Sequence, residues 1–284
     1  MFVEQVVPVS ADPEVMLFVA HSAGPAQRTL LVIHGGPDWD HSYLREPLVE
    51  LAGTHRLILP DLRGCGRSTR GLRDDEYTPD SVVGDLTALL DAYGVARVDV
   101  LGFSYGGLIA QRLAVDAPDR VRRLIIASSS ILPVPADAFA GWRVRDERRA
   151  REAQVWSDRM SAGAELTRAA AIAGASANIW RAAALPDYLR RLAAIRFSAE
   201  WMRPMLAGTL PSPRYENAAR RLAELNVPLL LLHGRQDMIF PSTLTTEAVA
   251  LIPSAQPVVI DEAGHMAHID QPDQWLGAVR EFLS

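Results

Sequence analysis

The sequence of 284 residues predicts an α/β fold: a mostly parallel, doubly wound sheet with an inserted all-helical cap. Three observations predict it. Short apolar runs alternate with helical patterns up to about residue 132, this alternation stops between 133 and 215, and it resumes after 216. Nearly continuous apolar runs suit parallel strands that are covered on both faces. We therefore expect a core formed by residues 1–132 and 216–284, interrupted by a helical cap, or lid, over 133–215.

The elements follow in chain order. The opening runs, 2–9 and 14–20, predict an antiparallel hairpin at the sheet edge. Six further runs predict buried strands: 29–35, 55–61, 97–103, 121–128, 227–234 and 255–264. A helix is expected to begin after Thr78, its N-cap, with Pro79 in the first position, and to stop at Gly94. A final helix, 272–283, begins at a proline.

Composition excludes several kinds of chemistry. All 29 basic residues are arginine, which excludes a lysine Schiff base, a P-loop lysine and a Ser-Lys dyad. The net charge of −5 argues against a general nucleic-acid partner. We see no metal-binding cluster and no dinucleotide fingerprint, so we expect neither metal nor cofactor. The sequence leaves the oligomeric state open.

Location is also indicated by composition. No apolar run approaches the roughly 18 residues of a membrane span, and the first ten residues do not resemble a signal peptide. The single cysteine, Cys65, permits no intrachain disulfide and is interpreted as a small residue in a glycine loop rather than a nucleophile. We expect a cytoplasmic protein without a membrane partner.

A candidate nucleophile lies in the stretch GFSYGG, residues 102–107. Ser104 follows a predicted strand and precedes a predicted helix, in the pattern G-x-S-x-G. This spacing holds a serine on a sharp turn, because side chains at positions 102 and 106 would collide with the neighbouring strand and helix. The turn would lie at the carboxyl edge of the sheet, where α/β folds bind their ligands.

A serine needs a base, and the base needs an acid that orients it. His265 lies in a loop just after the last predicted strand and is the expected base. Asp237 follows the preceding strand and is the expected acid; Asp261 and Glu262 are weaker alternatives. The chain order of nucleophile, acid and base is then the one expected of an α/β-hydrolase.

Acyl transfer also needs donors for the oxyanion. The loop HGGPDWDH, 34–41, follows a predicted strand, and since Pro37 has no N–H, Gly36 is the expected donor from this loop. The second expected donor is the backbone amide of Tyr105, directly after the nucleophile.

These motifs together resemble the α/β-hydrolase superfamily, and more closely its proline iminopeptidase-like branch, peptidase family S33. The resemblance is carried by HGGP (34–37), DLRGCGRST (61–69), GFSYGG (102–107), GRQD (234–237) and GH (264–265), and it spans nearly the whole chain. It implies a triad of Ser104, Asp237 and His265. It also implies an oxyanion hole at Gly36 and Tyr105.

The sequence departs from that branch in the elbow, where Phe103 and Tyr105 replace glycine and tryptophan, and in Asp38, which replaces glycine. We expect Asp38 to contact substrate, to fix the cap, or to cap its own loop. His268, three residues after the expected base, is expected to be structural or to line the pocket.

Residues 61–69 are expected to support the site from below. Asp61, Arg63 and Arg67 would do so through hydrogen bonds and ion pairs. In the insert, Trp142 and Trp156 are candidates for lining an apolar substrate pocket, together with Phe103 of the elbow.

The insert is net positive, with 13 arginines against 8 acidic residues over 133–215. Local pairs in a helix around 143–160, such as Arg148 with Glu152 and Asp146 with Arg149, explain many of its charges. Alternatively, the arginines form a patch that attracts a substrate with a carboxylate.

The expected function is hydrolysis of a small ester, lactone or amide through an acyl-enzyme on Ser104, so the partner is a small acyl substrate. One alternative, implied by the resemblance, is a proline iminopeptidase that releases an N-terminal proline. A second alternative is a non-catalytic ligand-binding protein on the same fold.

Overall fold

The computed structural model of the protein describes residues 2–25, 27–158 and 162–284. In these residues one sheet has eight strands in the order β1-β2-β4-β3-β5-β6-β7-β8. The strands are β1 (Val3–Ala11), β2 (Glu14–His21), β3 (Thr29–Ile33), β4 (Arg56–Pro60), β5 (Val98–Phe103), β6 (Val121–Ala127), β7 (Leu229–Gly234) and β8 (Ala255–Ile260). The hairpin β1–β2 and the pair β2–β4 are antiparallel, and all other pairs are parallel. The predicted fold class is confirmed.

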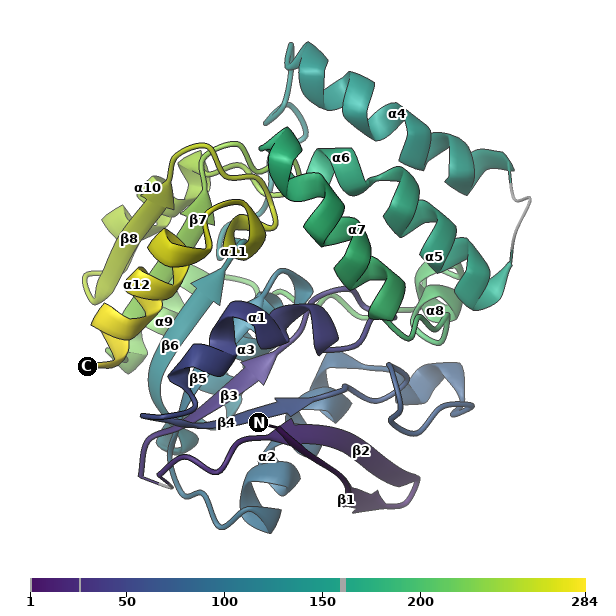
Figure 1. The fold of residues 1–284 in the computed structure, drawn as a ribbon. Helices are drawn as coiled ribbons and strands as arrows, with labels where there is room; N and C mark the ends of the chain where they lie inside the picture. The colour runs from purple at the N-terminus through teal and green to yellow at the C-terminus, as the bar shows by residue number, and fades with distance from the viewer. Residues whose placement is uncertain (1, 26, 159–161) are drawn as a thin grey trace.

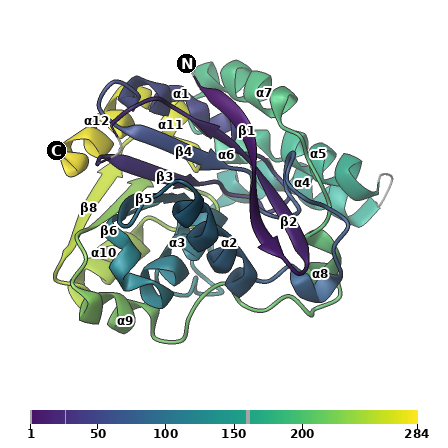
Figure 2. The same ribbon diagram turned by 90° about the horizontal axis from the view of Figure 1, so that it is seen from below.

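Helices cover both faces of the sheet (Figures 1 and 2). One face packs against α2 (Pro79–Ala92), α3 (Tyr105–Asp116), α9 (Ala218–Leu225) and α10 (Thr243–Leu251). The other face packs against α1 (Arg45–Leu48), α11 (Ala267–Asp270) and α12 (Pro272–Leu283). The short 3-10 helices are η1 (Ser42–Leu44), η2 (Val49–Leu51), η3 (Asp74–Glu76), η4 (Pro118–Arg120) and η5 (Ala182–Ala184).

Alternate side chains of one strand enter two separate cores. In β3, Leu31 and Ile33 pack with the first group of helices, whereas Leu30 and Val32 pack with the second group. This explains why the central strands are apolar at nearly every position.

The expected boundaries of α2 are confirmed. The Thr78 side chain accepts a hydrogen bond from the amide of Ser81, and Pro79 is the first helical residue. Gly94, just beyond the helix, has φ of +65°, a conformation that glycine adopts without strain.

Helices α4 to α8 lie between β6 and β7, within the segment predicted to be all-helical. They are α4 (Arg143–Asp158), α5 (Gly163–Ala173), α6 (Ala175–Asn178), α7 (Leu185–Ala194) and α8 (Met202–Leu206). Figure 1 shows them grouped to one side of the sheet, beyond the carboxyl ends of the central strands.

Helix α4 is attached to the rest of the protein by polar contacts. No residue of α4 is buried. Arg145 donates to the carbonyl of Met238, and Arg148 donates to the carbonyls of Ser176 and Ile179. The predicted pairing of Arg148 with Glu152 is therefore wrong, because the Arg148 guanidinium reaches backbone carbonyls of another segment. The predicted pair Asp146–Arg149 is also wrong, since Arg149 pairs with Glu152 instead.

Candidate active site

Ser104 lies on the sharp turn between β5 and α3. Its backbone has φ of 54° and ψ of −120°, a conformation that costs a non-glycine residue energy and is held by its surroundings. A side chain on Gly106 would meet the carbonyls of Ile33 and His34 at the end of β3, and one on Gly102 would meet α3. The two glycines thus allow β3, β5 and α3 to approach closely enough to form the turn.

His265 lies beside this serine. It belongs to the loop between β8 and α11, and its Nε2 is 3.0 Å from Oγ of Ser104. The rings of Phe103 and Phe240 contact the imidazole, with centroids 5.3 Å and 6.1 Å away. His265 therefore contacts two aromatic rings and has one nitrogen facing the serine hydroxyl.

Asp237 lies on the other side of the imidazole. Its Oδ2 is 2.9 Å from Nδ1 of His265, and its Oδ1 accepts hydrogen bonds from the amides of Ile239 and Phe240. Because a carboxylate only accepts, Nδ1 of His265 carries the proton and Nε2 is free to accept from Ser104. Burial alone would raise the pKa of Asp237, but attraction to His265 when that ring is protonated, and the hydrogen bonds from His233 and His265, hold it well below its usual value.

The two expected oxyanion donors flank the serine. Tyr105 is the first residue of α3, so its amide has no partner inside the helix. Gly36 has φ of +120° in the loop after β3 and lines the same cavity as Ser104. The neighbouring Gly35 is so close that a side chain there would come within 2.8 Å of Cβ of Ser104. The loop of Gly36 thus lies directly against the nucleophile turn.

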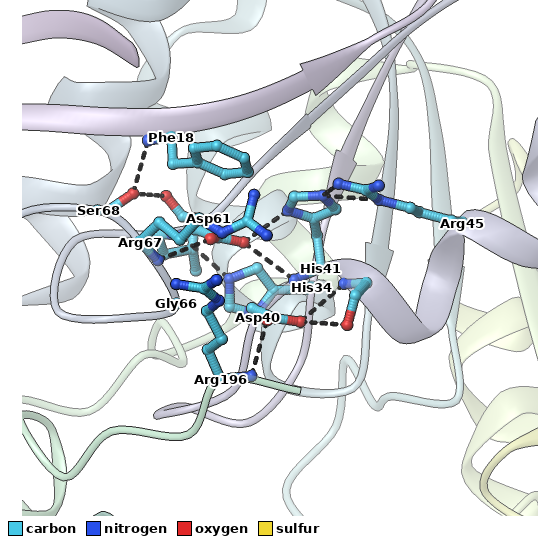
Figure 3. Close-up of polar contacts among 12 residues, drawn as sticks. Phe18, His34, Asp40, His41, Arg45, Asp61, Gly66, Arg67, Ser68 and Arg196 are labelled. Carbon is cyan, nitrogen blue, oxygen red and sulfur yellow. Dashed lines mark hydrogen bonds and ion pairs between the residues drawn. The ribbon is translucent and has the colours of Figure 1, made fainter. Parts of the chain in front are cut away.

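A buried polar network fixes this loop from below (Figure 3). Asp61 accepts from the backbone amide and from Nδ1 of His41, and its other oxygen accepts from the amide of Arg67. The amide of Leu62 donates to Nε2 of His34, the first residue of the HGGP motif. The expected support by Asp61 and Arg67 is confirmed.

Arg63 supports the same region differently. It forms a buried, two-contact pair with Asp85 of α2, at 2.6 Å and 2.7 Å, and its carbonyl accepts from the indole of Trp201. Cys65 between these residues is fully buried, and burial raises the pKa of its thiol well above the usual value. This cysteine is therefore a packed residue and not a thiolate nucleophile.

A cavity of about 280 Å³ opens over the serine. Its floor contains Gly36, Phe103, Ser104 and His265, and its roof comes from the insert. The charged side chains among the described lining residues are Arg149 and Glu152 of α4, which form an ion pair at 3.2 Å. Nη1 of Arg149 is buried and has no hydrogen-bond partner among the described residues.

The structure brings some of the expected substrate contacts to this cavity. Phe103 and Trp156 line it. Trp142 does not; it precedes α4 and packs near Phe139, with ring centroids 6.1 Å apart. His268 is not in the lining either, because it is fully buried among the rings of Tyr43, Phe103 and Trp275. Burial lowers the pKa of His268 well below its usual value, so it is a neutral, structural residue.

Asp38 is buried and does not line the cavity. Its carboxylate accepts from the hydroxyl of Ser198 and from the amides of Trp201 and Met202. Of the three expected roles, the structure agrees with fixing the insert, because every one of these donors belongs to the segment that returns from α7 to α8. Burial raises the pKa of Asp38, although these hydrogen bonds oppose the shift.

Sequence reasoning missed two residues that hold the acid and the base. His233, at the end of β7, has Nε2 3.2 Å from Oδ2 of Asp237. Asp270 is buried below the base; it accepts from the amides of Gly264, Trp180 and Arg181 and so joins the His265 loop to the insert. The spacing of four between positions 233 and 237 is a signal that could have indicated the first residue. Nothing local indicates the second.

A membrane-spanning helix and a metal-binding cluster are both absent from the described part of the chain. No helix there is long and apolar enough to cross a membrane. No cluster of three or more histidine, cysteine or acidic side chains there could hold a metal ion.

Comparisons with known proteins agree with this fold. Residues 28–272 match the family described as alpha/beta hydrolase fold. The chain is 31% identical to a 2-hydroxymuconate semialdehyde hydrolase of Pseudomonas sp. (strain CF600), over 93% of this chain and 89% of that protein. It is 26% identical to a 2-hydroxy-6-oxo-2,4-heptadienoate hydrolase of Pseudomonas putida, over 93% of this chain and 91% of that protein.

A solved structure is similar over the whole length. It is a proline iminopeptidase-related protein from Thermus thermophilus, with 25% sequence identity and a TM-score of 0.74. The similarity covers 100% of this chain and 97% of that one. The two chains therefore share the same overall fold along their whole length.

Proposed function

The chain belongs to the alpha/beta hydrolase fold family, and we propose that it is a serine hydrolase of small acyl substrates. One observation carries the proposal: Ser104, His265 and Asp237 form a continuous hydrogen-bonded line, with distances of 3.0 Å and 2.9 Å, at the floor of a cavity. Hydrolases among the similar proteins support the reaction class.

In this proposal, Oγ of Ser104 attacks the carbonyl carbon of the substrate while Nε2 of His265 takes the hydroxyl proton. The carbonyl oxygen becomes an oxyanion and accepts hydrogen bonds from the amides of Gly36 and Tyr105. When the bond to the leaving group breaks, His265 donates its proton to that group. Water, deprotonated by His265, then attacks the acyl-enzyme, and the proton returns to Ser104 as the acid is released.

Ser104→Ala tests the proposal. We expect hydrolysis of a 4-nitrophenyl ester to fall by about 10⁴-fold or more, because the nucleophile is removed while binding is retained. A fluorophosphonate should label the wild-type protein at Ser104 and leave the variant unlabelled. Unchanged hydrolysis by the variant would overturn the proposal, and a wild-type protein that is neither labelled nor active would favour the non-catalytic ligand-binding alternative.

The iminopeptidase alternative is less well supported by the cavity. A substrate with a free ammonium group needs carboxylates to bind it, and the charged acceptor among the described lining residues, Glu152, is paired with Arg149. Release of naphthylamine from prolyl-naphthylamide at a rate above that from matched esters would reverse this preference.

We further propose that residues 133–215 act as the cap and that the substrate carries a carboxylate. The buried Nη1 of Arg149 lacks an acceptor among the described residues, and a substrate carboxylate entering the cavity would supply one. The names of both hydrolase relatives specify carboxylate substrates, a muconate semialdehyde and an oxoheptadienoate. The sharpest test is a pair of esters that differ only in this charge, compared in the wild type and in an Arg149 variant.

A further inference from the structure

A second histidine shares the carboxylate of Asp237. Oδ2 of Asp237 lies 2.9 Å from Nδ1 of His265 and 3.2 Å from Nε2 of His233. The side chains of His233 and Asp237 are 2% and 0% exposed, so water does not screen this contact. The mechanism proposed above uses only His265 and leaves the second imidazole without a role.

The protonation of His233 follows from its neighbours. Its Nε2 is also 2.9 Å from the carbonyl oxygen of Phe240. A carbonyl and a carboxylate only accept hydrogen bonds, so Nε2 of His233 must carry a proton, which it donates to the carbonyl of Phe240 with Oδ2 of Asp237 beside it at 3.2 Å. The N–H of His233 is thus held next to the oxygen that also accepts from His265.

The same contact orients the loop after β7. Phe240, whose carbonyl accepts from His233, places its ring on the imidazole of His265 and donates its amide to Asp237. His233 therefore holds both the carboxylate that orients the base and the aromatic ring that packs on it.

We propose that His233 is a positioning residue that tunes the base His265 through Asp237; this inference rests on the proposed function. A donor on Oδ2 withdraws part of the negative charge that would otherwise stabilise protonated His265. Removing that donor should therefore leave more negative charge on Asp237 to stabilise the protonated form of His265.

Other charged groups near this carboxylate are few. His265 comes from the loop after β8, and His233 comes from β7 itself. From α4, Arg145 reaches the same loop, but its guanidinium donates to the carbonyl of Met238. The ion pairs of Asp237 within the described residues are with the two histidines.

The test measures the rate at which a fluorophosphonate labels Ser104 between about pH 5 and pH 9, which requires no knowledge of the natural substrate. His233→Phe keeps a ring of similar size and removes the N–H. We expect the midpoint of the acidic limb to move up by about one pH unit, so labelling at about pH 6 falls roughly tenfold while the alkaline plateau changes much less. His233→Gln, which restores an N–H donor, should return the midpoint toward that of the wild type.

Controls separate the possible failures. His55→Phe removes a buried histidine that lies just before β4 and should leave the profile unchanged. A loss of labelling by the same factor at every pH in His233→Phe, with an unmoved midpoint, would assign His233 a merely structural role and overturn the inference. If that variant does not fold, His233→Asn, whose shorter amide does not reach Asp237, must show the same shift. Absence of labelling in the wild-type protein would instead contradict the proposed function.

Discussion

The carboxylate of Asp38 accepts a hydrogen bond from the backbone amide of Trp201 at 3.0 Å. Asp38 lies two residues after the expected oxyanion donor Gly36, whereas Trp201 belongs to the segment that leads from the insert into α8. The carbonyl of Asp38 also accepts from the amide of Ser198. The position of the loop that contains Gly36 is thus coupled to the position of the insert.

Asp38→Asn should disturb both the loop that contains Gly36 and the insert. The amide keeps the size of the carboxylate but directs an N–H₂ group toward a backbone N–H, and one buried group left unpaired costs about 1–3 kcal/mol. We expect a lower midpoint of thermal unfolding and slower labelling of Ser104, because the Gly36 loop loses its anchor. Asp119→Asn, at an exposed carboxylate, is the matched control. Wild-type values for both measurements would show that the contact is unimportant.

Gly106→Ala should destabilise the protein. The added methyl group would meet the backbone carbonyls of Ile33 and His34, neither of which is a flexible side-chain end. Such overpacking costs about 1–3 kcal/mol, and it would displace the nucleophile turn. Gly84→Ala in α2, where nothing lies within 4 Å, should instead stabilise by about 0.5–1 kcal/mol. Urea unfolding of both variants measures the two effects, and equal changes of the same sign would contradict the packing argument.

Asp237→Asn should lower turnover of a 4-nitrophenyl ester by about 10⁴-fold, because the amide no longer holds His265 in the tautomer that accepts from Ser104. Asp261→Asn is the control, since Asp261 is exposed and pairs with Arg235. Comparable losses in both variants would argue that Asp237 has no special role.

The pH dependence of the wild-type enzyme follows from the same carboxylate. The pKa of Asp237 lies below its usual value, which means that its ionised form is favoured and persists as the pH falls. Asp237 should therefore make no contribution to the acidic limb of kcat/KM, and the slope of that limb in a logarithmic plot should not exceed one. A slope of two between about pH 5 and pH 7 would show that Asp237 is protonated in the same range.

Arg149→Gln should discriminate between substrates by charge. For the anionic ester 4-nitrophenyl hydrogen succinate, we expect KM to rise by roughly tenfold or more, since a hydrogen bond to a charged group contributes about 1.5–3 kcal/mol. For 4-nitrophenyl butyrate, which is neutral and of similar size, KM should change little.

Two further variants control this comparison. Arg151→Gln, at an exposed arginine of the same helix, should leave both esters unaffected. The double variant with Glu152→Gln removes the carboxylate that Arg149→Gln would leave unpaired. Parallel changes for the two esters would contradict a carboxylate-binding role.

The sequence was sufficient to predict the sheet and the proposed triad. Ser104 and Asp237 each follow a fully buried apolar strand, His265 follows the partly exposed edge strand β8, and the carboxyl ends of parallel strands meet at one edge. The strand pattern therefore predicted that Ser104 and His265, which are 161 positions apart, would lie close together. That prediction needed no knowledge of side-chain packing.

The side-chain contacts of the insert could not be predicted from the sequence. Its helical character was evident, and local ion pairs such as Arg143–Glu147 do form within α4. The two pairs named in advance were wrong, however, and Trp142 and Trp156 could not be told apart. Neither periodicity nor local charge reveals which face of α4 covers the cavity, because α4 has no buried apolar stripe.

What the sequence by itself determined is the order of the strands along the chain and the residue types at their ends. Only the tertiary structure decided which contacts the loops make with one another. Asp38 contacts the insert, Asp270 contacts the loop of His265, and His233 contacts Asp237. The physical reason is that backbone pattern and burial are local properties of a strand or helix, whereas these hydrogen bonds depend on the distances and angles that result when all the elements pack together.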